Sequence, residues 1–512
     1  MDAKRSVRSR RRPQLGLRAR MSRVLKELRR VRRSADAEAV HDLRVAIRRC
    51  RSVATIMEEV DGHRGWRAMK RLPRKLFRAL GNLRDLHVLE SWVKRLASVH
   101  DPLRPQLLDV LEDRETVPRH HVHRVAGHFD QDGWKRLART LPMRARLVPP
   151  NSLTAQCLAL ERFEDLCQLH ARAVRTATPA PWHALRVGLK RFRYAAEILL
   201  PERSVVWDEG LGQVQRLLGE IHDLDVLSAR ITQESDGFDA ASARSLRHAI
   251  ATKRRACIEQ YRRRMSGEGS LLNVWNAGLP HGKAIESATA ARLHTTARAM
   301  DPHLRRTAAT ARLALQLFDG LAASGAEPRF RDETLQRILH AAAKLHAIDV
   351  DSRATSRHKA ARNFLRAVPL PRGWKAHEWD LLTEVVRYHR GAEPAAKHKR
   401  FAQLSRERQE CVRGLAGLLR LARGLRRCGV TVAGGVRVEK TAAYVRLCVS
   451  GFRDTEDDAA RLAAAKHLLE GYLRRPLLIE SAKVAAPIGR PRLAYSSPRR
   501  GTNLAADLRR RA

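Results

Sequence analysis

Apolar residues recur every three to four positions along most of this chain, the spacing of amphipathic helices. From about residue 21 to residue 428 the pattern predicts successive helices, interrupted at Pro73 and at Pro149-Pro150. Beyond residue 428 the period shortens to that of strands. We predict strands within 430–439, 442–451 and 475–481, with a helix over 456–473 between the last two.

One basic segment and one companion segment each occur twice in the sequence. Residues 41–51 read HDLRVAIRRCR and residues 183–193 read HALRVGLKRFR. LGNLRDLHVL at 80–89 returns as LGEIHDLDVL at 218–227. Because both motif pairs repeat at nearly the same separation, the chain is predicted to hold two similar helical bundles in tandem. The repeats cover about 21–175 and 180–265, a linker covers 266–284, and a further helical domain with a small α/β end covers 285–485.

The repeated helix carries its cations on one face. In each copy, the His and the cations three, seven and ten residues after it fall within a stripe roughly 80° wide, because successive helical residues turn by about 100°. Like charges on one stripe cost stability unless an anion lies against them. Arg49 and Arg191 lie beside the stripe and face neighbouring surfaces. The residues predicted to bind a polyanion are His41, Arg44, Arg48, Arg49, Arg51, Arg74, Lys75, Arg78, His183, Arg186, Lys190, Arg191 and Arg193.

The charge balance supports an anionic partner. Lys and Arg number 100 against 54 Asp and Glu, a formal net charge of +46, which is typical of proteins that bind nucleic acid, acidic membranes or another polyanion. A genome rich in G and C is an alternative origin for scattered arginines. Aromatic residues make up only 5%, which leaves few stacking platforms, so nucleic-acid binding through the Arg-rich arm 1–20 and tail 486–512 would be incidental.

The remaining composition indicates a cytoplasmic protein. The 7 cysteines are scattered and form no C-x-x-C pair, which favours reduced thiols over a disulfide scaffold or a zinc ribbon. No apolar run reaches the length of a membrane span, and no apolar signal core follows the basic N-terminus. We therefore expect no membrane association, and we expect the arm and tail to be flexible.

Residues 21–265 resemble the CHAD family, the conserved-histidine α-helical domains. The resemblance rests on the two H-x-x-R-V-x-x-[RK]-R-x-R helices and the two LG-x-x-[RH]-D-x-x-V-L segments. It implies two antiparallel helical bundles around a basic cavity that binds inorganic polyphosphate, and association with polyphosphate granules. Asp85 and Asp223 recur as well, and three roles stay open for them: catalysis, metal ligation, or orientation of a basic side chain or helix cap.

Residues 285–485 resemble the C-terminal, HD-type half of the exopolyphosphatase/guanosine-pentaphosphatase family. The phrases that carry this resemblance are ARLALQLFDGL, ILHAAAKLHAIDV, RHKAARNFL, VVRYHRG and LLRLARGLRR. It implies secondary phosphate contacts and allows a homodimer. The contacts are His358, Lys359, Arg387, His389 and Arg390.

The HD-type metal site of that family is altered here. An HD site needs an adjacent His-Asp pair to hold divalent metals, but Ala347 follows His346, and Arg423 stands where a later Asp is expected. His303, His346 and Asp349 are the remaining candidate ligands. The actin-like, phosphate-cleaving half of exopolyphosphatases has no counterpart in the chain.

Three functions follow as hypotheses. The leading one is a non-catalytic, cofactor-free, inorganic polyphosphate-binding protein in the cytoplasm, associated with polyphosphate granules. The alternative is a metal-dependent phosphohydrolase that acts on polyphosphate or nucleotides through the altered HD-type site. The third is general nucleic-acid binding through phosphate contacts.

Overall fold

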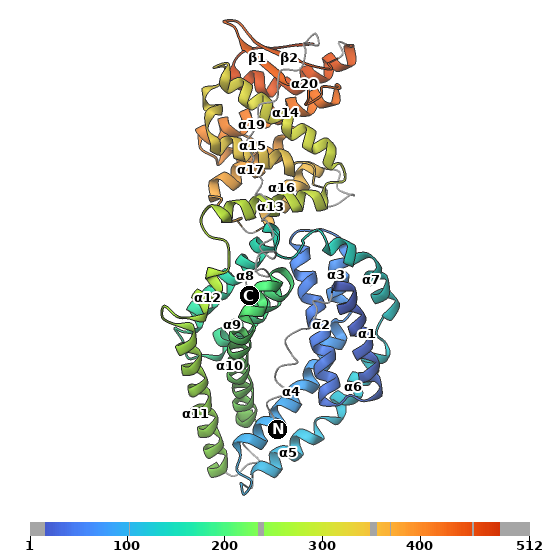
Figure 1. Ribbon diagram of the computed structural model, residues 1–512, viewed down its shortest axis with the longest axis vertical. Helices are drawn as coiled ribbons and strands as arrows, with labels where there is room; N and C mark the ends of the chain where they lie inside the picture. The colour runs from blue at the N-terminus through green and yellow to red at the C-terminus, as the bar shows by residue number, and fades with distance from the viewer. Residues whose placement is uncertain are drawn as a thin grey trace, which may run out of the picture. The chain divides into compact units, whose positions relative to one another are not determined.

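The computed structural model describes residues 16–101, 103–233, 240–348, 356–368, 370–452 and 455–481. Most of the predicted basic arm and all of the predicted tail lie outside these residues. The described part is mainly α-helical and has one three-stranded sheet near its C-terminal end, which confirms the predicted fold class (Figure 1). In this part, none of the helices is both long and apolar enough to cross a membrane.

The first repeat and its continuation are built from eight helices. They are α1 (Leu17–Arg33), α2 (Ala37–Glu58), α3 (Arg64–Arg71), α4 (Arg74–Leu96), α5 (Leu103–Asp113), α6 (Thr116–Gly127), α7 (Gln131–Ala145) and α8 (Leu153–Ala173). Pro73 precedes the first residue of α4, where its missing N–H costs nothing. Asp36 caps α2 by accepting a hydrogen bond from the Ala39 backbone N–H at 2.8 Å.

The second repeat uses longer helices. They are α9 (Pro179–Leu199), α10 (Pro201–Gln233) and α11 (Ala240–Met265). In the two basic helices the apolar side faces the core, with Leu43 and Ile47 of α2 and Leu185 and Leu189 of α9 fully buried and Val45 and Val187 half-buried. One continuous hydrophobic core includes residues of α1, α2, α8, α9 and α10, so the two repeats fold together.

The predicted linker 266–284 is partly folded. Helix α12 (Leu271–Ala277) lies within it, and Ser270 caps this helix through the Asn273 backbone N–H at 3.3 Å. Trp275 is fully buried, with its ring 5.8 Å from that of Phe192. Apolar residues four positions apart, Leu271, Trp275 and Leu279, give this Gly- and Ser-rich segment a face that packs on the core.

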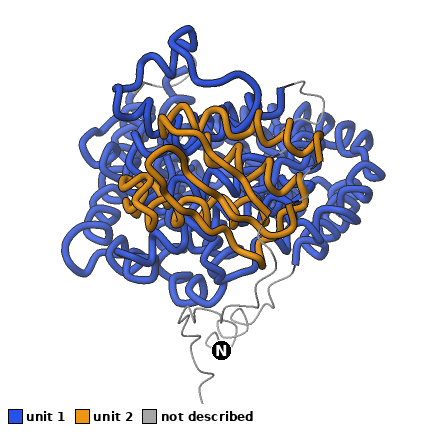
Figure 2. The backbone as a smooth tube through the Cα atoms, turned by 90° about the horizontal axis from the view of Figure 1, so that it is seen from above, with its two compact units in different colours: residues 1–308, 337–416 blue, residues 309–336, 417–512 orange. Residues whose placement is uncertain are grey.

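Contacts divide the chain into two compact units. Unit 1 is residues 1–308 and 337–416, and unit 2 is residues 309–336 and 417–512 (Figure 2). The remaining helices are α13 (Lys283–Met300), α14 (Leu304–Ala323), α15 (Glu333–Leu345), α16 (Arg357–Ala367), α17 (Ala376–Tyr388), α18 (Lys399–Ala402), α19 (Arg406–Arg427) and α20 (Glu456–Leu473), with a 3-10 turn at Pro328–Arg331. The predicted domain 285–485 therefore contributes residues to both units.

The small sheet of unit 2 matches the predicted strands and helix. Strand β1 (Val436–Lys440) pairs antiparallel with β2 (Val445–Val449), and β2 pairs parallel with β3 (Leu477–Ser481) after the crossover helix α20. The first strand begins later than predicted because Gly434 and Gly435 form a turn, and Gly435 takes φ of 68°.

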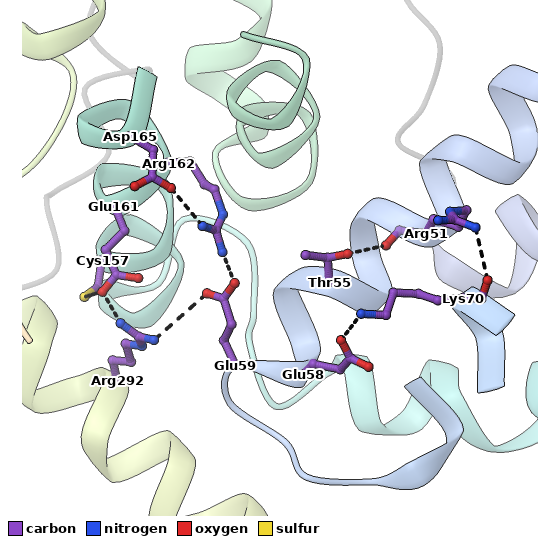
Figure 3. A network of polar contacts seen from close by, with 10 residues as sticks. All are labelled: Arg51, Thr55, Glu58, Glu59, Lys70, Cys157, Glu161, Arg162, Asp165 and Arg292. Atoms are coloured by element: carbon purple, nitrogen blue, oxygen red, sulfur yellow. Dashed lines mark hydrogen bonds and ion pairs between the residues drawn. The ribbon is translucent and has the colours of Figure 1, made fainter. Parts of the chain in front are cut away.

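An ion network centred on the buried Arg292 ties α13 to α8 within unit 1. Arg292 of α13 is only 6% exposed and pairs with Glu161 of α8 and with Glu59, which follows α2 (Figure 3). Arg162 pairs with the same Glu59 and with Asp165. We call Glu59, Glu161, Arg162, Asp165 and Arg292 the Arg292 network. A neighbouring hydroxyl pair, Thr154 and Thr295 at 2.8 Å, also joins α8 to α13.

Candidate anion-binding site

The four helices that carry the repeated motifs pack against one another. Within unit 1, α2 contacts α9 and α4, and α10 contacts α9 and α4. Each repeat supplies one basic helix and one helix with the LG-x-x-[RH]-D motif. The packing therefore brings both copies of both motifs into one neighbourhood.

Four cations from the two repeats interact at this junction. Burial lowers the pKa of Arg44, and the nearby charges of Arg48 and Arg186 lower it further. Burial also lowers the pKa of Lys190 to about 7, with Arg186 and Arg48 acting in the same direction. All four side chains are half-buried. We call Arg44, Arg48, Arg186 and Lys190 the basic cluster. Like charges held this close favour an anion among them.

Two carboxylates lie beside the basic cluster. Asp223 of α10 lies 4.0 Å from the Arg186 guanidinium. Burial raises the pKa of Asp85 of α4, while the Arg44 and Arg186 charges oppose the rise. Two acids among four cations leave the cluster with a net positive charge. This geometry supports the orienting role among the three that the sequence left open, because each Asp interacts with an Arg of the cluster.

The repeated histidines lie at the edge of the basic cluster. The Nδ1 atoms of His183 and His222 are 3.1 Å apart, so one ring donates a hydrogen bond to the other. Burial lowers the pKa of His222 to about 4, and the Arg186 charge adds to this effect. In the first repeat, burial and the Arg84 charge lower the pKa of His41. His222 and Arg84 are not among the residues predicted from the sequence, although both fill the [RH] position of the second motif.

Phe77 organises three of the predicted arginines. The guanidinium carbons of Arg44, Arg48 and Arg51 lie 4.9, 5.9 and 5.1 Å from the centre of its ring. Arg44 also donates a hydrogen bond to the Phe77 carbonyl at 3.4 Å, and Arg51 donates one to the Lys70 carbonyl at 3.1 Å. Cation–π contacts of this kind hold guanidinium groups together despite their repulsion. Nothing in the sequence pattern predicts this role of Phe77.

In the second repeat, the last cation of the stripe, Arg193, does not belong to the basic cluster. Arg193, the counterpart of Arg51, donates a hydrogen bond to Asp208 at 2.9 Å and another to Gln215 at 3.2 Å. Glu197 lies 3.5 Å from Arg193 and 3.7 Å from Arg49. Protein acids thus neutralise Arg49 and Arg193, which places them outside the basic cluster.

The other predicted cations lie on separate surfaces. Arg191 lines a pocket of about 240 Å³ between α8 and α9, together with Arg162 and Arg172. At the start of α4, Arg74, Lys75 and Arg78 are exposed. Arg74 remains close enough to Arg51 for its charge to contribute to the lowered pKa of that residue, after burial.

One predicted secondary phosphate contact, His389, lies beside His346, which is a candidate metal ligand. The rings of His346 and His389 are buried and lie 4.9 Å apart, and the His358 ring lies 6.3 Å from that of His389. Burial lowers the pKa of Arg390, and Arg357 adds to the effect. Arg387 is buried with its guanidinium carbon 5.1 Å from the centre of the Tyr388 ring. Lys359 is exposed.

Two of the three candidate metal ligands, His303 and His346, lie within the described residues. His346 Nδ1 lies 2.7 Å from the Ala343 carbonyl oxygen, and the backbone N–H of His303 donates to Asp301 at 2.7 Å. Asp349 lies outside the described residues. Within the residues that the structure describes, there is no group of three or more His, Cys, Asp or Glu side chains that could hold a metal ion. All seven cysteines are free thiols.

Comparison with known proteins agrees with both resemblances. Residues 16–204 match the CHAD domain model, and residues 289–447 match the model of Ppx/GppA phosphatase, domain III. Among solved structures, the CHAD domain from the plant Ricinus communis matches with 23% sequence identity and a TM-score of 0.37 over 51% of this chain and 88% of that chain. No curated protein matches the chain. The chain thus joins a CHAD domain at residues 16–204 to a Ppx/GppA phosphatase domain III at residues 289–447.

Proposed function

We propose that this protein binds inorganic polyphosphate without cleaving it, and that the basic cluster is the centre of the binding site. The two matched domains point to a function related to polyphosphate. The observation that carries the proposal is the meeting of Arg44 and Arg48 with Arg186 and Lys190 across the two repeats. A flexible chain of phosphates has charge but no base edges, so guanidinium and ammonium groups are sufficient to recognise it.

The proposal includes the partners and location expected from the sequence. His358, Lys359, Arg387, His389 and Arg390 are proposed as secondary phosphate contacts, because the His358 ring lies 6.3 Å from the buried His389 ring and Arg387 lies in the helix that ends just before His389. Binding would place the protein in the cytoplasm on polyphosphate granules. Nucleic-acid binding is proposed to be incidental, and a homodimer remains compatible with the domain III resemblance.

The test compares two polyanions under one set of conditions. We would titrate the full chain with long-chain polyphosphate and with duplex DNA of equal charge across a salt series, and measure phosphate release with Mn²⁺ or Mg²⁺ in the same tubes. We expect a preference for polyphosphate, an affinity that falls steeply with salt, and no released phosphate. Equal affinity for DNA would contradict the proposal. Metal-dependent phosphate release would instead favour the phosphohydrolase alternative, with His346 as the first residue to examine.

Gly81 allows a sharper test of the Arg44 position. A Cβ at residue 81 would fall well inside van der Waals contact with Arg44 Nη1, so Gly81→Ala must displace this flexible guanidinium. Since a hydrogen bond to a charged group contributes about 1.5–3 kcal/mol, we expect polyphosphate affinity to fall by roughly 10- to 150-fold, as measured by titration calorimetry.

Gly219 is the matched control for Gly81. It occupies the same position in the second copy of the motif, but a Cβ there would meet nothing within 4 Å. Both glycines lie inside helices, where alanine is favoured by about 1 kcal/mol. Gly219→Ala should therefore leave polyphosphate affinity unchanged. Equal effects of the two substitutions would show that the Arg44 position does not matter for binding.

The lowered pKa of Lys190 predicts that polyphosphate binding depends on pH. With a pKa of about 7 in the free protein, Lys190 loses its charge as the pH rises above neutrality. A bound polyanion stabilises the protonated form, so binding takes up a proton and weakens with rising pH. Between pH 7 and about pH 9 we expect the affinity for long-chain polyphosphate to fall by up to about tenfold per pH unit.

Lys190→Arg is the control for this pH effect, because a guanidinium stays charged across that range. The charged groups that act on Lys190 are Arg44, Arg48, Arg186 and Asp223, and the three arginines keep their charge between pH 7 and 9. The variant should therefore bind with a flatter pH profile than the wild type. Identical profiles for both proteins would exclude Lys190 as the titrating group.

A further inference from the structure

A second basic site lies in the domain III part of unit 1. A cavity of about 110 Å³ opens between α13, α15 and the turn at 372–374. It has room for several water molecules or for one small organic molecule. None of the residues predicted from the sequence to bind phosphate lines this cavity.

Three basic side chains line this cavity. His294 comes from α13, and His340 and Lys344 come from α15. In the described part of the chain, no hydrogen bond or ion pair engages any of these three side chains. They do interact with one another, because burial lowers the pKa of His340 to about 4 and the Lys344 and His294 charges act in the same direction. Donors from two helices thus converge with no anion between them.

The other charged residues of the cavity are already engaged or lie at its edge. Arg337 pairs with Glu378 at 2.5 Å and donates to the Gly373 carbonyl at 3.1 Å, and Arg372 pairs with Glu164 at 2.5 Å. Glu286 is the only acid that lines the cavity among the described residues, and it is exposed. The three unpaired bases therefore remain available to a ligand.

The remaining lining of the cavity is apolar. It consists of Ala290, Leu293, Ala341, Leu345 and Trp374. Arg337 lies 4.6 Å from the centre of the Trp374 ring, and the Trp379 ring packs against Trp374 in a T-shaped arrangement with 5.6 Å between ring centres, so the indole is held in place. A fixed apolar wall next to unpaired donors is the usual design of a site for a small organic ligand. Polyphosphate, which has no apolar portion, would leave this wall unused.

We propose that this cavity binds a small organic phosphate, distinct from the polyphosphate at the basic cluster. His294, His340 and Lys344 would contact the phosphate, whose three oxygens match three donors. Leu293 and Trp374 would contact the apolar portion of the ligand. The site combines charge with an apolar surface, so neither feature alone is sufficient for full affinity.

The test uses phenyl phosphate as the probe, with calorimetric titration of the full chain. Inorganic phosphate supplies the charge alone, phenol supplies the ring alone, and benzoate replaces the phosphate with a carboxylate. We expect phenyl phosphate to bind at least about tenfold more tightly than each of the three. Equal affinity for inorganic phosphate would overturn the apolar part of the proposal, and equal affinity for benzoate would overturn the phosphate part.

Two variants assign the binding to this cavity. Lys344→Met keeps the length of the apolar stem and should weaken phenyl phosphate at least about tenfold, while Lys283→Met, on α13 but outside the cavity, should change it by less than about twofold. His294→Gln is an exposed second substitution in case Lys344→Met destabilises the fold. Both cavity variants should keep wild-type polyphosphate affinity, which separates this site from the basic cluster. Unchanged phenyl phosphate binding in both cavity variants would overturn the proposal.

Discussion

The double substitution of Arg44 and Arg186 by Glu is expected to reduce polyphosphate affinity by roughly 100-fold or more, since two hydrogen bonds to charged groups contribute about 1.5–3 kcal/mol each. Both side chains belong to the basic cluster, one from each repeat, and each interacts with Asp85. Reversal removes two cations and adds two carboxylates next to the existing acids. The remaining cluster would repel a polyanion. Calorimetric titration at 0.1 M salt would measure the loss.

A matched double variant controls for net charge. Arg29→Glu with Arg255→Glu makes the same charge change, with one substitution in each repeat, at exposed positions away from the basic cluster. It should weaken binding only modestly, because long-range attraction is screened over about 10 Å at 0.1 M salt. Thermal melting of both variants would establish that they are folded. A similar loss of affinity in the two variants would mean that polyphosphate binds by diffuse attraction rather than at the cluster.

The positions of the two basic helices illustrate how far the sequence could predict the site. Helical periodicity places Arg44 and Arg48 on one face of α2, and Arg186 and Lys190 on one face of α9. Periodicity within one helix cannot say that the two faces meet, because the packing of α2 against α9 depends on core residues far apart in the sequence. The duplication suggested a shared ligand, and the structure places the two faces together.

The ends of the two stripes illustrate what the sequence could not predict. Arg51 and Arg193 occupy equivalent positions, but Arg51 lies over Phe77 while Arg193 pairs with Asp208. The neighbouring helix decides the partner of each arginine. Phe77 of α4 faces Arg51, whereas the equivalent position of α10 is Gln215, with acids nearby. Composition also gave no indication of helix α12 within the segment 266–284, where Trp275 and Leu279 are buried among Gly and Ser residues.

The strands and helix of the C-terminal end were the most predictable elements. Alternation at Val445, Leu447 and Val449 puts three buried side chains on one face of β2, a local pattern that needs no knowledge of the rest of the fold. Helix α20 begins one residue after its cap, Thr455, which accepts from the Asp458 backbone N–H at 3.3 Å. Local chemistry fixed both elements, whereas the basic cluster required contacts between distant helices.

Replacement of Arg292 by Met is expected to destabilise unit 1 by about 3–5 kcal/mol, the usual effect of removing one partner from a buried ion pair. The substitution keeps an apolar stem in α13 but leaves Glu161 buried without its main cation (Figure 3). Urea unfolding followed by circular dichroism would measure the change. Arg298→Met is the control, because Arg298 is an exposed cation on the same helix, and its loss should change stability by less than about 0.5 kcal/mol.

The pH dependence of the stability of the Arg292→Met variant tests whether Glu161 carries the unpaired charge. Burial raises the pKa of Glu161, and Arg292 opposes the rise, so the substitution should raise this pKa further. A carboxyl whose pKa is higher in the folded than in the unfolded protein binds protons more tightly when folded, and its contribution to stability therefore falls as the pH rises between the two values. The deficit of the variant should be largest near pH 7 and should shrink as the pH falls toward the unfolded pKa of about 4.3.

Adding Glu161→Gln to Arg292→Met should recover part of the lost stability at pH 7, because the amide carries no charge to bury. A deficit that grows on acidification, or no recovery with Glu161→Gln, would show that α13 is held to α8 by apolar packing instead of by the Arg292 network.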